Sequence, residues 1–351
     1  MRPATLIGML ALLAMLVAAA WQISESPGSI GLGSLKSGGA QTGARVTVSV
    51  FEGDSAKQIG ERLQDAGAID SATQFRVLVA LMGYDSLLQA GEYEFDHNTP
   101  VLEAVQRIRH GQVATRTVTV IEGWRLEEVA DAVAKTGLTT ADEFKRMAVV
   151  ANFKEYTFLQ DAKPDATLEG YLYPATYSFG TKATAKDIIE MMLTKFGETL
   201  TRDLRNQVDQ SPYTLPQVLT IASIIEREAK VAEERPTMAQ VFLKRLTIRQ
   251  ALEADPTVQY ALGSQADSVA RFGYWKRELT LADYSFSSPY NTYVNAGLPP
   301  GPICSPRIDS IKAVLNPSPT NFLYFVAKPD GSHAFAETYA EHLANVSRYT
   351  S

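Results

Sequence analysis

The sequence predicts an α+β protein with an N-terminal transmembrane helix, a small subdomain of βααβ order and a larger mixed α/β domain. Three observations support this: an uncharged apolar run near the N-terminus, a strand-turn-helix pattern that occurs twice, and a long apolar helix pattern in the C-terminal half. At ~150 residues per domain, the 351 residues suffice for two or three domains. We place the boundaries at 1–22 for the membrane helix, 23–45 for a flexible linker, 46–114 for the subdomain and 115–351 for the larger domain.

The composition is that of an ordinary globular chain and excludes several classes of protein. Hydrophobic residues make up 45% of the chain, charged residues 21%, and the net charge is −6. Nucleic-acid-binding domains carry a basic patch or stripe, so we expect no nucleic-acid partner. The single cysteine, Cys304, excludes an intramolecular disulfide and a cysteine-based zinc site. We expect neither a metal nor a cofactor.

The apolar run from Ala4 to Trp21 is uncharged. As a helix at ~1.5 Å per residue, it nearly spans the ~30 Å hydrocarbon core of a bilayer. Arg2 precedes this run and Glu25 follows it, so the positive-inside tendency keeps the N-terminus in the cytoplasm and places the body outside the cytoplasmic (inner) membrane. The alternative is a cleaved signal peptide, because the alanines at 18–20 resemble a cleavage site. Both interpretations predict a body in the periplasm or on the outer side.

The subdomain at 46–114 follows a glycine- and serine-rich tether and shows a strand, helix, helix, strand order. Its expected elements are a strand at 46–50, a turn at Glu52–Gly53, a helix containing Ile59 and Leu63, a helix at 72–82, a strand at 91–95 and a helix at 100–109. The first strand-turn-helix unit recurs, since residues 118–137 align without gaps on 48–67. We therefore expect two locally similar units, one in each domain.

The segment TLPQVLTIASIIEREAK (214–230) predicts a helix that is apolar nearly all round and therefore buried. At ~100° per residue, Glu226 and Glu228 point ~200° apart, so they cannot form an acid/base pair at one site. Glu228 projects into the widest apolar arc, whereas Glu226 lies at a polar edge where a cation or water can satisfy it. Apolar surroundings raise a carboxyl pKa, as a general acid requires, so Glu228 is the better candidate and Glu226 the runner-up. The bland alternative is that both are solvated or ion-paired.

Four other stretches combine aromatic rings, carboxylates and rigid loops. They are LEGYLYPATYSF (168–179), LEADPTVQYALG (252–263), PYNTYVNAGLPPGPICSP (289–306) and NFLYFVAKPDGSHAF (321–335). In the first, Glu169 lies among tyrosines, a mixture suited to sugar rings. In the second, Asp255 opens a helix. The fourth predicts a hairpin whose His333 is structural rather than catalytic.

Taken in order with ASIIEREA, these motifs resemble the endolytic murein (peptidoglycan) transglycosylases, membrane-anchored enzymes of bacteria. The likeness runs from about residue 46 to the C-terminus, and the order of the subdomain is similar to that of a LysM module. The resemblance implies cleavage of the β-1,4 bond from N-acetylmuramic acid to N-acetylglucosamine within glycan strands, leaving a 1,6-anhydro end. It also implies that residues 115–351 form the catalytic domain of a lyase. Peptidoglycan is then the substrate, and cell-wall synthesis enzymes are expected partners.

The resemblance implies that one glutamate of the E-x-E pair acts first as general acid and then as general base, and we assign this role to Glu228. Other residues in family motifs are expected to bind substrate or steady the transition state; they are Glu169, Tyr173, Tyr177, Asp255, Asn291 and Tyr293. For Asp255 and Asn291, turn or helix capping is an equally good explanation. Two positions depart from the family pattern: Glu253 stands where glutamine is expected, and Arg307 where glycine is expected. We expect neither to contact the glutamate pair.

Two other functions remain open from the sequence. A hydrolytic muramidase would use Asp255 or Glu169 to activate water and would leave a reducing end instead of an anhydro end. A non-enzymatic wall-binding scaffold would rely on the LysM-like subdomain, although strand-helix units of this kind are also common as positioning elements without sugar affinity.

Overall fold

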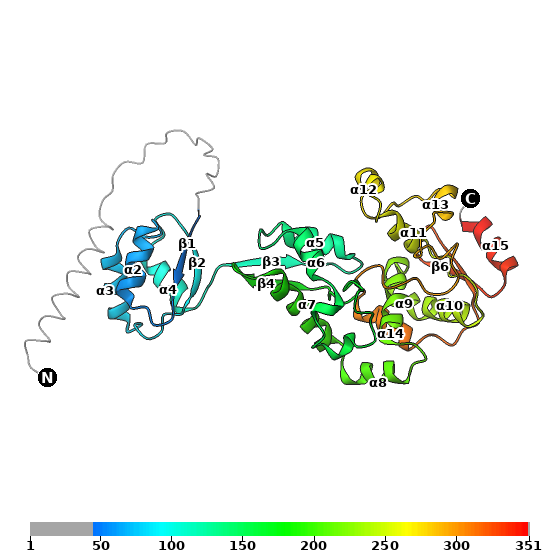
Figure 1. Cartoon of the computed structure of the whole chain (residues 1–351), viewed down its shortest axis with the longest axis horizontal. Helices are drawn as coiled ribbons and strands as arrows, with labels where there is room; N and C mark the ends of the chain where they lie inside the picture. Colours follow the sequence, from blue (N-terminus) through cyan, green and yellow to red (C-terminus); the bar gives the residue numbers. More distant parts are fainter. Residues whose placement is uncertain (1–44, 350–351) are drawn as a thin grey trace, which may run out of the picture. The chain divides into compact units, whose positions relative to one another are not determined.

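The computed structural model describes residues 45–349 (Figure 1). The predicted transmembrane helix and most of the linker lie outside these described residues. Within 45–349, every helix is too short or too polar to cross a membrane.

The N-terminal part of the described chain has the predicted βααβ order followed by a helix. Its elements are β1 (Arg45–Val50), α2 (Ala56–Asp65), α3 (Ala72–Met82), β2 (Gly91–Asp96) and α4 (Val101–Arg109). β1 pairs with β2 in a two-stranded sheet. Ile59 and Leu63, which share one face of α2, are buried against Phe75 and Phe95, so the apolar period predicts the packed face correctly.

The first half of the larger part surrounds a second two-stranded sheet. The elements are β3 (Thr115–Thr119), α5 (Leu126–Ala134), α6 (Ala141–Met147), β4 (Thr176–Gly180), α7 (Ala185–Thr199) and α8 (Arg202–Gln210). β3 and β4 are antiparallel, with Val118 opposite Tyr177. Both of these side chains are buried, and they belong to a core separate from that of residues 48–108.

The second half is mainly helical and ends in a hairpin and a helix. The elements are α9 (Leu215–Glu228), α10 (Arg235–Thr247), α11 (Asp255–Leu262), α12 (Ala266–Phe272), α13 (Leu281–Tyr284), α14 (Ile308–Leu315), β5 (Tyr324–Ala327), β6 (His333–Ala336) and α15 (Tyr339–Tyr349). The hairpin is antiparallel, with Ala327 opposite His333. Among the described residues each sheet has two strands, so helices supply most of the packing.

Helix α9 lies at the centre of this half and packs against α10, α11 and α14 (Figure 1). Thr214 and Gln217 form the capping box that starts it, and Pro216 lies in its first turn, where no amide donor is needed. Its residues from Val218 to Ile225 are all buried. The prediction of a buried helix at this position is confirmed, and the helix ends at Glu228 itself.

The two strand-turn-helix units have the same local form. Gly53 and Gly123 both have positive φ, 83° and 78°, which explains why glycine occupies this turn position in each. Their surroundings differ, because the space beside Gly53 is open whereas Gly123 packs against the side chain of Arg227. The second unit is thus built against the end of α9.

Candidate active site

Glu226 is held by hydrogen bonds at the start of α14. Its carboxylate accepts from the Arg307 amide at 3.1 Å, from Arg307 Nε at 2.8 Å and from the Ser310 hydroxyl at 2.7 Å. Its side chain is 2% exposed. An acidic group at a helix N-terminus, paired with an arginine and fully bonded, has little freedom to exchange protons with a ligand.

The expectation that Arg307 does not contact the glutamate pair is wrong. Arg307 is the N-cap residue of α14, and the packing of α14 on α9 brings its amide and guanidinium onto Glu226. The two residues are 81 positions apart in the chain, so the local sequence carries no sign of this ion pair.

Glu228, in contrast, has no hydrogen bond or ion pair among residues 45–349. Its half-buried side chain lines a cavity of about 640 Å³. Its pKa is raised to about 8, mainly because the carboxyl group is buried. The nearby charge of Asp255 also raises this pKa, and the smaller effect of Arg227 lowers it. A carboxyl group with such a pKa is largely protonated at neutral pH, so it can act as a proton donor.

Asp255 and two tyrosines form one wall of this cavity. The hydroxyl of Tyr293 donates to Asp255 Oδ1 at 2.7 Å, and that of Tyr284 lies 3.5 Å from Oδ2. The two tyrosine rings are 4.6 Å apart between centroids. The wall therefore combines a bonded carboxylate with aromatic faces, a combination that suits a sugar ring.

Buried polar bonds fix this wall to the start of α11. The Ala254 amide donates to the Thr292 hydroxyl at 3.0 Å, and the hydroxyls of Thr292 and Thr257 are 2.9 Å apart. The Asn291 side chain is fully buried; it donates to the carbonyls of Tyr284 and Phe286 and accepts from the Tyr293 amide. Asn291 thus shapes the loop that carries Tyr293 and does not itself face the cavity.

The C-terminal hairpin and helix also line this cavity. His333 donates its amide to Glu234, and its Nδ1 lies 2.7 Å from the other Glu234 oxygen. Arg245 bonds the carbonyls of Leu323 and Leu252 and pairs with Glu253. His333, Arg245 and Glu253 all line the cavity, as do Tyr339 and His342 of α15. The bond to Glu234 gives His333 the kind of partner expected of a structural histidine.

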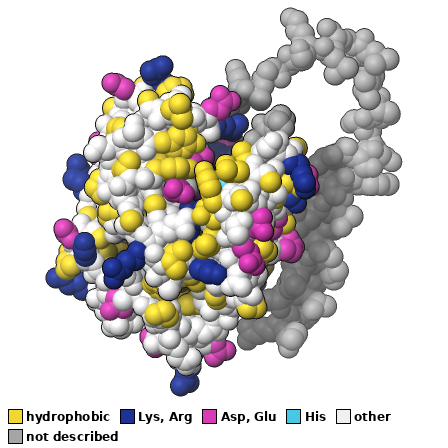
Figure 2. All heavy atoms as spheres, turned by 90° about the vertical axis from the view of Figure 1, so that its right-hand side faces the viewer, with side chains coloured by type: hydrophobic (Ala, Val, Ile, Leu, Met, Phe, Trp, Pro, Cys, Tyr) yellow, Lys and Arg dark blue, Asp and Glu magenta, His cyan; other side chains and the backbone are white. Residues whose placement is uncertain are grey.

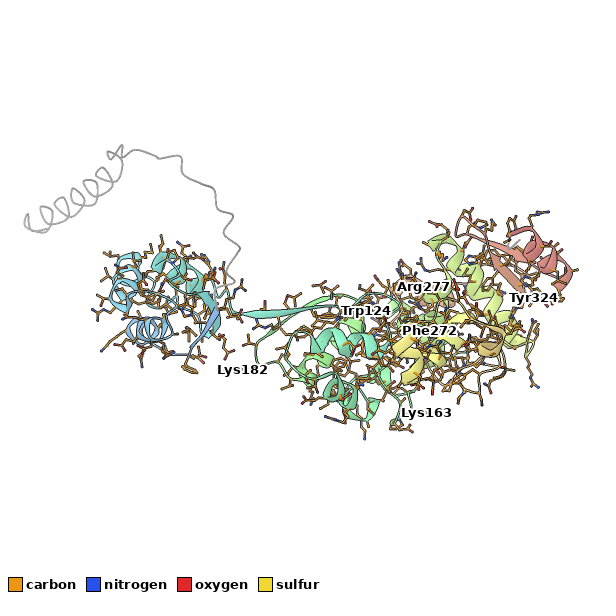
Figure 3. The ribbon with its side chains drawn as sticks, turned by 90° about the horizontal axis from the view of Figure 1, so that it is seen from above. Trp124, Lys163, Lys182, Phe272, Arg277 and Tyr324 are labelled. Carbon is orange, nitrogen blue, oxygen red and sulfur yellow. The ribbon has the colours of Figure 1, made fainter. Side chains whose placement is uncertain are left out.

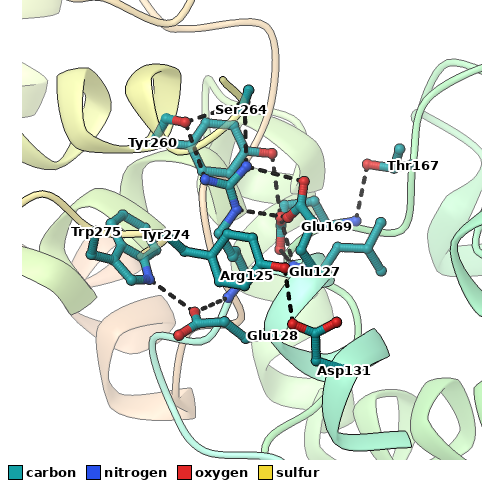
Figure 4. Close-up of polar contacts among 11 residues, drawn as sticks. Arg125, Glu127, Glu128, Asp131, Thr167, Glu169, Tyr260, Ser264, Tyr274 and Trp275 are labelled. Carbon is teal, nitrogen blue, oxygen red and sulfur yellow. Dashed lines mark hydrogen bonds and ion pairs between the residues drawn. The ribbon is translucent and has the colours of Figure 1, made fainter. Parts of the chain in front are cut away.

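Glu169 belongs to a different polar cluster, at the start of α5 (Figure 4). Only 3% exposed, it accepts the Leu126 amide at 3.0 Å and the Tyr260 hydroxyl at 3.3 Å. Burial raises its pKa to about 8 against the opposing effect of the Leu126 bond. Beside it, the fully buried Arg125 pairs with Glu127 and stacks on the Tyr260 ring. This cluster joins α5 to α11, and Glu169 does not line the Glu228 cavity.

The predicted tyrosines Tyr173 and Tyr177 also lie outside that cavity. Tyr177 is a core residue of β4, 5% exposed, and its hydroxyl donates to the Tyr173 carbonyl. Of the predicted site residues, the structure therefore brings together Glu228, Asp255 and Tyr293. It places Glu226, Glu169, Tyr173, Tyr177 and Asn291 elsewhere.

Sequence reasoning missed Tyr284 and the hairpin wall. Tyr284 lies in LADYSF, a stretch with no motif of its own, and only its contact with Asp255 gives it a role. Across residues 45–349, no cluster of His, Cys, Asp or Glu has the composition of a metal site. On the face drawn in Figure 2, acidic and basic side chains are interspersed among hydrophobic ones, without a broad basic area.

Comparisons with known proteins match most of the chain. Residues 48–348 match the family described as YceG-like. An endolytic murein transglycosylase of Bacillus subtilis is 32% identical over 323 residues, covering 87% of this chain and 85% of the relative. One of Streptococcus pneumoniae R6 is 28% identical over 327 residues, covering 87% of this chain but 58% of the relative. The crystal structure of a yceG-like protein from Listeria monocytogenes superposes with a TM-score of 0.58 at 33% identity, covering 86% of this chain and 98% of that one.

Proposed function

Because this chain belongs to the YceG-like family, we propose that it is an endolytic murein transglycosylase that uses Glu228 as its single acid/base group. The observation that carries the catalytic assignment is the contrast at the end of α9. The Glu226 carboxylate accepts three hydrogen bonds. The Glu228 carboxyl group, in contrast, has no hydrogen bond among residues 45–349, lines a cavity and has a pKa raised to about 8.

In the first step, the protonated Glu228 donates its proton to the glycosidic oxygen between N-acetylmuramic acid and N-acetylglucosamine. The bond from that oxygen to the anomeric carbon breaks, and N-acetylglucosamine leaves with a free 4-hydroxyl. Positive charge develops at the anomeric carbon, and Glu228 is now a carboxylate.

In the second step, the C6 hydroxyl oxygen of the same muramic acid bonds to the anomeric carbon, and Glu228 takes the hydroxyl proton. The product has a 1,6-anhydro end, the enzyme is restored, and no water is consumed. One carboxyl group suffices, because Glu228 donates a proton in the first step and accepts one in the second.

Asp255 supplies a negative charge that lines the same cavity as the protonated Glu228. It keeps the pKa of Glu228 high before the reaction and favours the positive charge that develops at the anomeric carbon. The Tyr293 hydroxyl fixes the orientation of Asp255, and the rings of Tyr284 and Tyr293 offer apolar faces to the sugar.

The proposed enzyme acts outside the cytoplasm, where peptidoglycan lies. We place the catalytic body, residues 115–351, on the outer side of the cytoplasmic membrane, tethered by a single N-terminal helix that begins in the cytoplasm. The LysM-like subdomain at 46–114 would contact glycan strands, and wall-synthesis enzymes would be neighbours. The uncharged run at 4–21 supports the anchor.

Analysis of digested sacculi by mass spectrometry tests the reaction. Wild type should release muropeptides with anhydro ends, and Glu228→Gln should bind sacculi without releasing them. Products heavier by one water would establish the hydrolytic alternative, for which Asp255 is the available second carboxylate. Activity retained in Glu228→Gln but lost in Glu226→Gln would overturn the assignment of the acid/base group.

A further inference from the structure

A second cavity, of about 750 Å³, is lined by helices α8, α10 and α14 and shares no lining residue with the cavity at Glu228. The first turns of α8 and α10, helices of 9 and 13 residues, contribute to its wall. Helix N-termini favour negatively charged groups. By themselves these ends do not define a site, but one side chain in the cavity points to a ligand.

Arg235 is 6% exposed and lines this cavity, yet within residues 45–349 its side chain makes neither a hydrogen bond nor an ion pair. Its Nε atom is completely buried without an acceptor. A buried guanidinium nitrogen without an acceptor is costly, because its hydration is lost and nothing replaces it. Other buried arginines here are paired, since Arg125 contacts Glu127 and Arg245 contacts Glu253. Arg235 thus lacks an acceptor that a ligand can supply.

The other charges of the cavity define the kind of ligand. Lys312 is a second cation, and Asp309 pairs with it at 3.6 Å. The carboxylates of Asp203 and of Glu198, which pairs with Lys195, also line the cavity. A polyanion such as a phosphate chain would be repelled by three carboxylates. A ligand that carries both carboxylate and ammonium groups matches this arrangement, with its carboxylate on Arg235 and its ammonium near the acidic side chains. Asn316 Nδ2 donates to Gln207 Oε1 at 2.9 Å, which leaves the Gln207 amide nitrogen and the Asn316 amide oxygen to bond a peptide backbone.

We propose that this cavity binds the peptide stem of peptidoglycan, with a stem carboxylate on the Arg235 guanidinium. The proposal rests on the proposed function, which supplies a substrate that carries carboxylates, amino groups and amides on one short peptide. It adds a substrate-binding site separate from the cavity where the glycan is cleaved.

The chain connects the two cavities through adjacent residues. Glu234 bonds His333, which lines the cavity at Glu228, and the next residue, Arg235, lines the second cavity. A stem bound to Arg235 is therefore held against the same short segment that supports the wall of the cleavage site.

Binding is tested on the full-length Glu228→Gln protein, so that no cleavage interferes. The probe is the tripeptide L-alanyl-γ-D-glutamyl-meso-diaminopimelic acid, and isothermal titration measures its affinity. Adding Arg235→Met should weaken binding at least about tenfold, since a hydrogen-bonded charge pair is lost, and Arg235→Lys should restore part of it. The control is Lys163→Met, which removes one positive charge from an exposed position outside this cavity (Figure 3). Equal affinity with and without Arg235 would overturn the proposal.

Thermal melting separates a binding role from a structural one. Because Arg235 is buried without a partner, Arg235→Met should leave Tm unchanged or raise it, whereas a structural arginine would lower it. A second measurement uses unmutated Arg235: the Nε–H signal in the NMR spectrum should shift when the tripeptide is added. No shift at saturating peptide, or an equal shift with poly-L-glutamate, would refute the assignment to the stem.

The cleavage assay adds an independent readout. Wild type should have a lower KM for stem-bearing strands than for strands stripped of stems by an amidase, and Arg235→Met should bring this ratio close to one. A ratio of one in wild type would overturn the inference while leaving the proposed reaction intact. Tripeptide binding through Arg235 in a protein that forms no anhydro ends would instead refute the proposed reaction.

Discussion

Glu226 and Glu228 lie two residues apart in the last turn of α9, but their carboxyl groups are in different environments. On the side of α14, Glu226 is enclosed by Arg307 and Ser310 and serves as a bonded cap. On the side of α11, Glu228 faces a cavity without a partner and has a raised pKa. Burial alone does not distinguish a structural acid from a proton donor. What distinguishes them is whether hydrogen-bond donors satisfy the charged form.

Glu169 extends this comparison to a third carboxyl group. Its pKa is also raised to about 8, like that of Glu228, but the Leu126 amide and the Tyr260 hydroxyl already occupy its oxygens. A raised pKa is therefore not sufficient for a catalytic role. Access to a cavity is also required.

The largest expected effect comes from Glu228→Gln. Removing a general acid/base group should lower the rate of anhydro-end formation about 10²–10⁴-fold.

The same substitution should change how stability depends on pH. The folded-state pKa of Glu228, about 8, lies above the ordinary value of 4.5. Its stabilising contribution is therefore complete below pH 4.5 and is lost as the pH rises through 8. Relative to wild type, Glu228→Gln should have an equal Tm at pH 4 and a higher Tm at pH 9, measured by calorimetry. A lower Tm at pH 9 would contradict the absence of partners.

The second effect concerns stability instead of rate. Glu226→Gln should lower the free energy of unfolding by about 2 kcal/mol, because hydrogen bonds to a charged group are lost at the α9–α14 contact. Urea denaturation measures this change. The matched control is Asp142→Asn, which breaks an exposed ion pair with Lys145 and should change the free energy of unfolding far less. If both variants were equally stable, Glu226 would not be the structural member of the pair.

Asp255→Asn sharpens the contrast through the pH profile. The proposed mechanism requires protonated Glu228, so we expect kcat/KM to fall as the pH rises through about 8. Removing the charge of Asp255 lowers the pKa of Glu228, and the falling limb should move to lower pH. Glu253→Gln is the control, because Glu253 lines the same cavity but does not contribute to the Glu228 shift. An unmoved limb in Asp255→Asn would exclude this electrostatic role.

The smallest effect is expected from Tyr293→Phe. Loss of its 2.7 Å bond to Asp255 should reduce kcat by about fivefold, or about 1 kcal/mol, with little change in Tm. Tyr284→Phe, whose hydroxyl lies 3.5 Å from Asp255, should have a smaller effect still. Steady-state rates on purified glycan strands measure both. The reverse order would mean that Tyr284 is the main support of Asp255.

Local patterns in the sequence predicted the elements that hold the site. The strand pattern and the apolar periods placed β1, α3 and α9 within a residue or two of their observed bounds, and they placed Ile59 and Leu63 correctly in a helix, α2. These features depend on neighbours within about four positions, which is the range over which caps and helix faces act. The ~200° separation of Glu226 and Glu228 follows from the same local geometry.

The wrong expectation about Arg307 and the position of Glu169 have one physical origin, because the partners of both residues come from distant segments. Tyr177 and Asn291 instead bond within a few positions, and folding turns both into the interior. Glu169 meets Leu126 43 positions away, and Asn291 turns inward to shape its own loop. A motif indicates that a residue matters, but not whether it faces a ligand or the core.

The sequence by itself determined that α9 is a buried helix and that its two glutamates point to opposite sides, since both follow from helical periodicity. Only the tertiary structure decided which glutamate is satisfied, because Arg307 and Ser310 reach Glu226 from 81 and 84 positions away. The tertiary structure also leaves the Nε atom of Arg235 without an acceptor beside the cavity lined by α8, α10 and α14. The balance of desolvation and hydrogen bonding at a buried charge is set by groups that the chain brings together only when it folds.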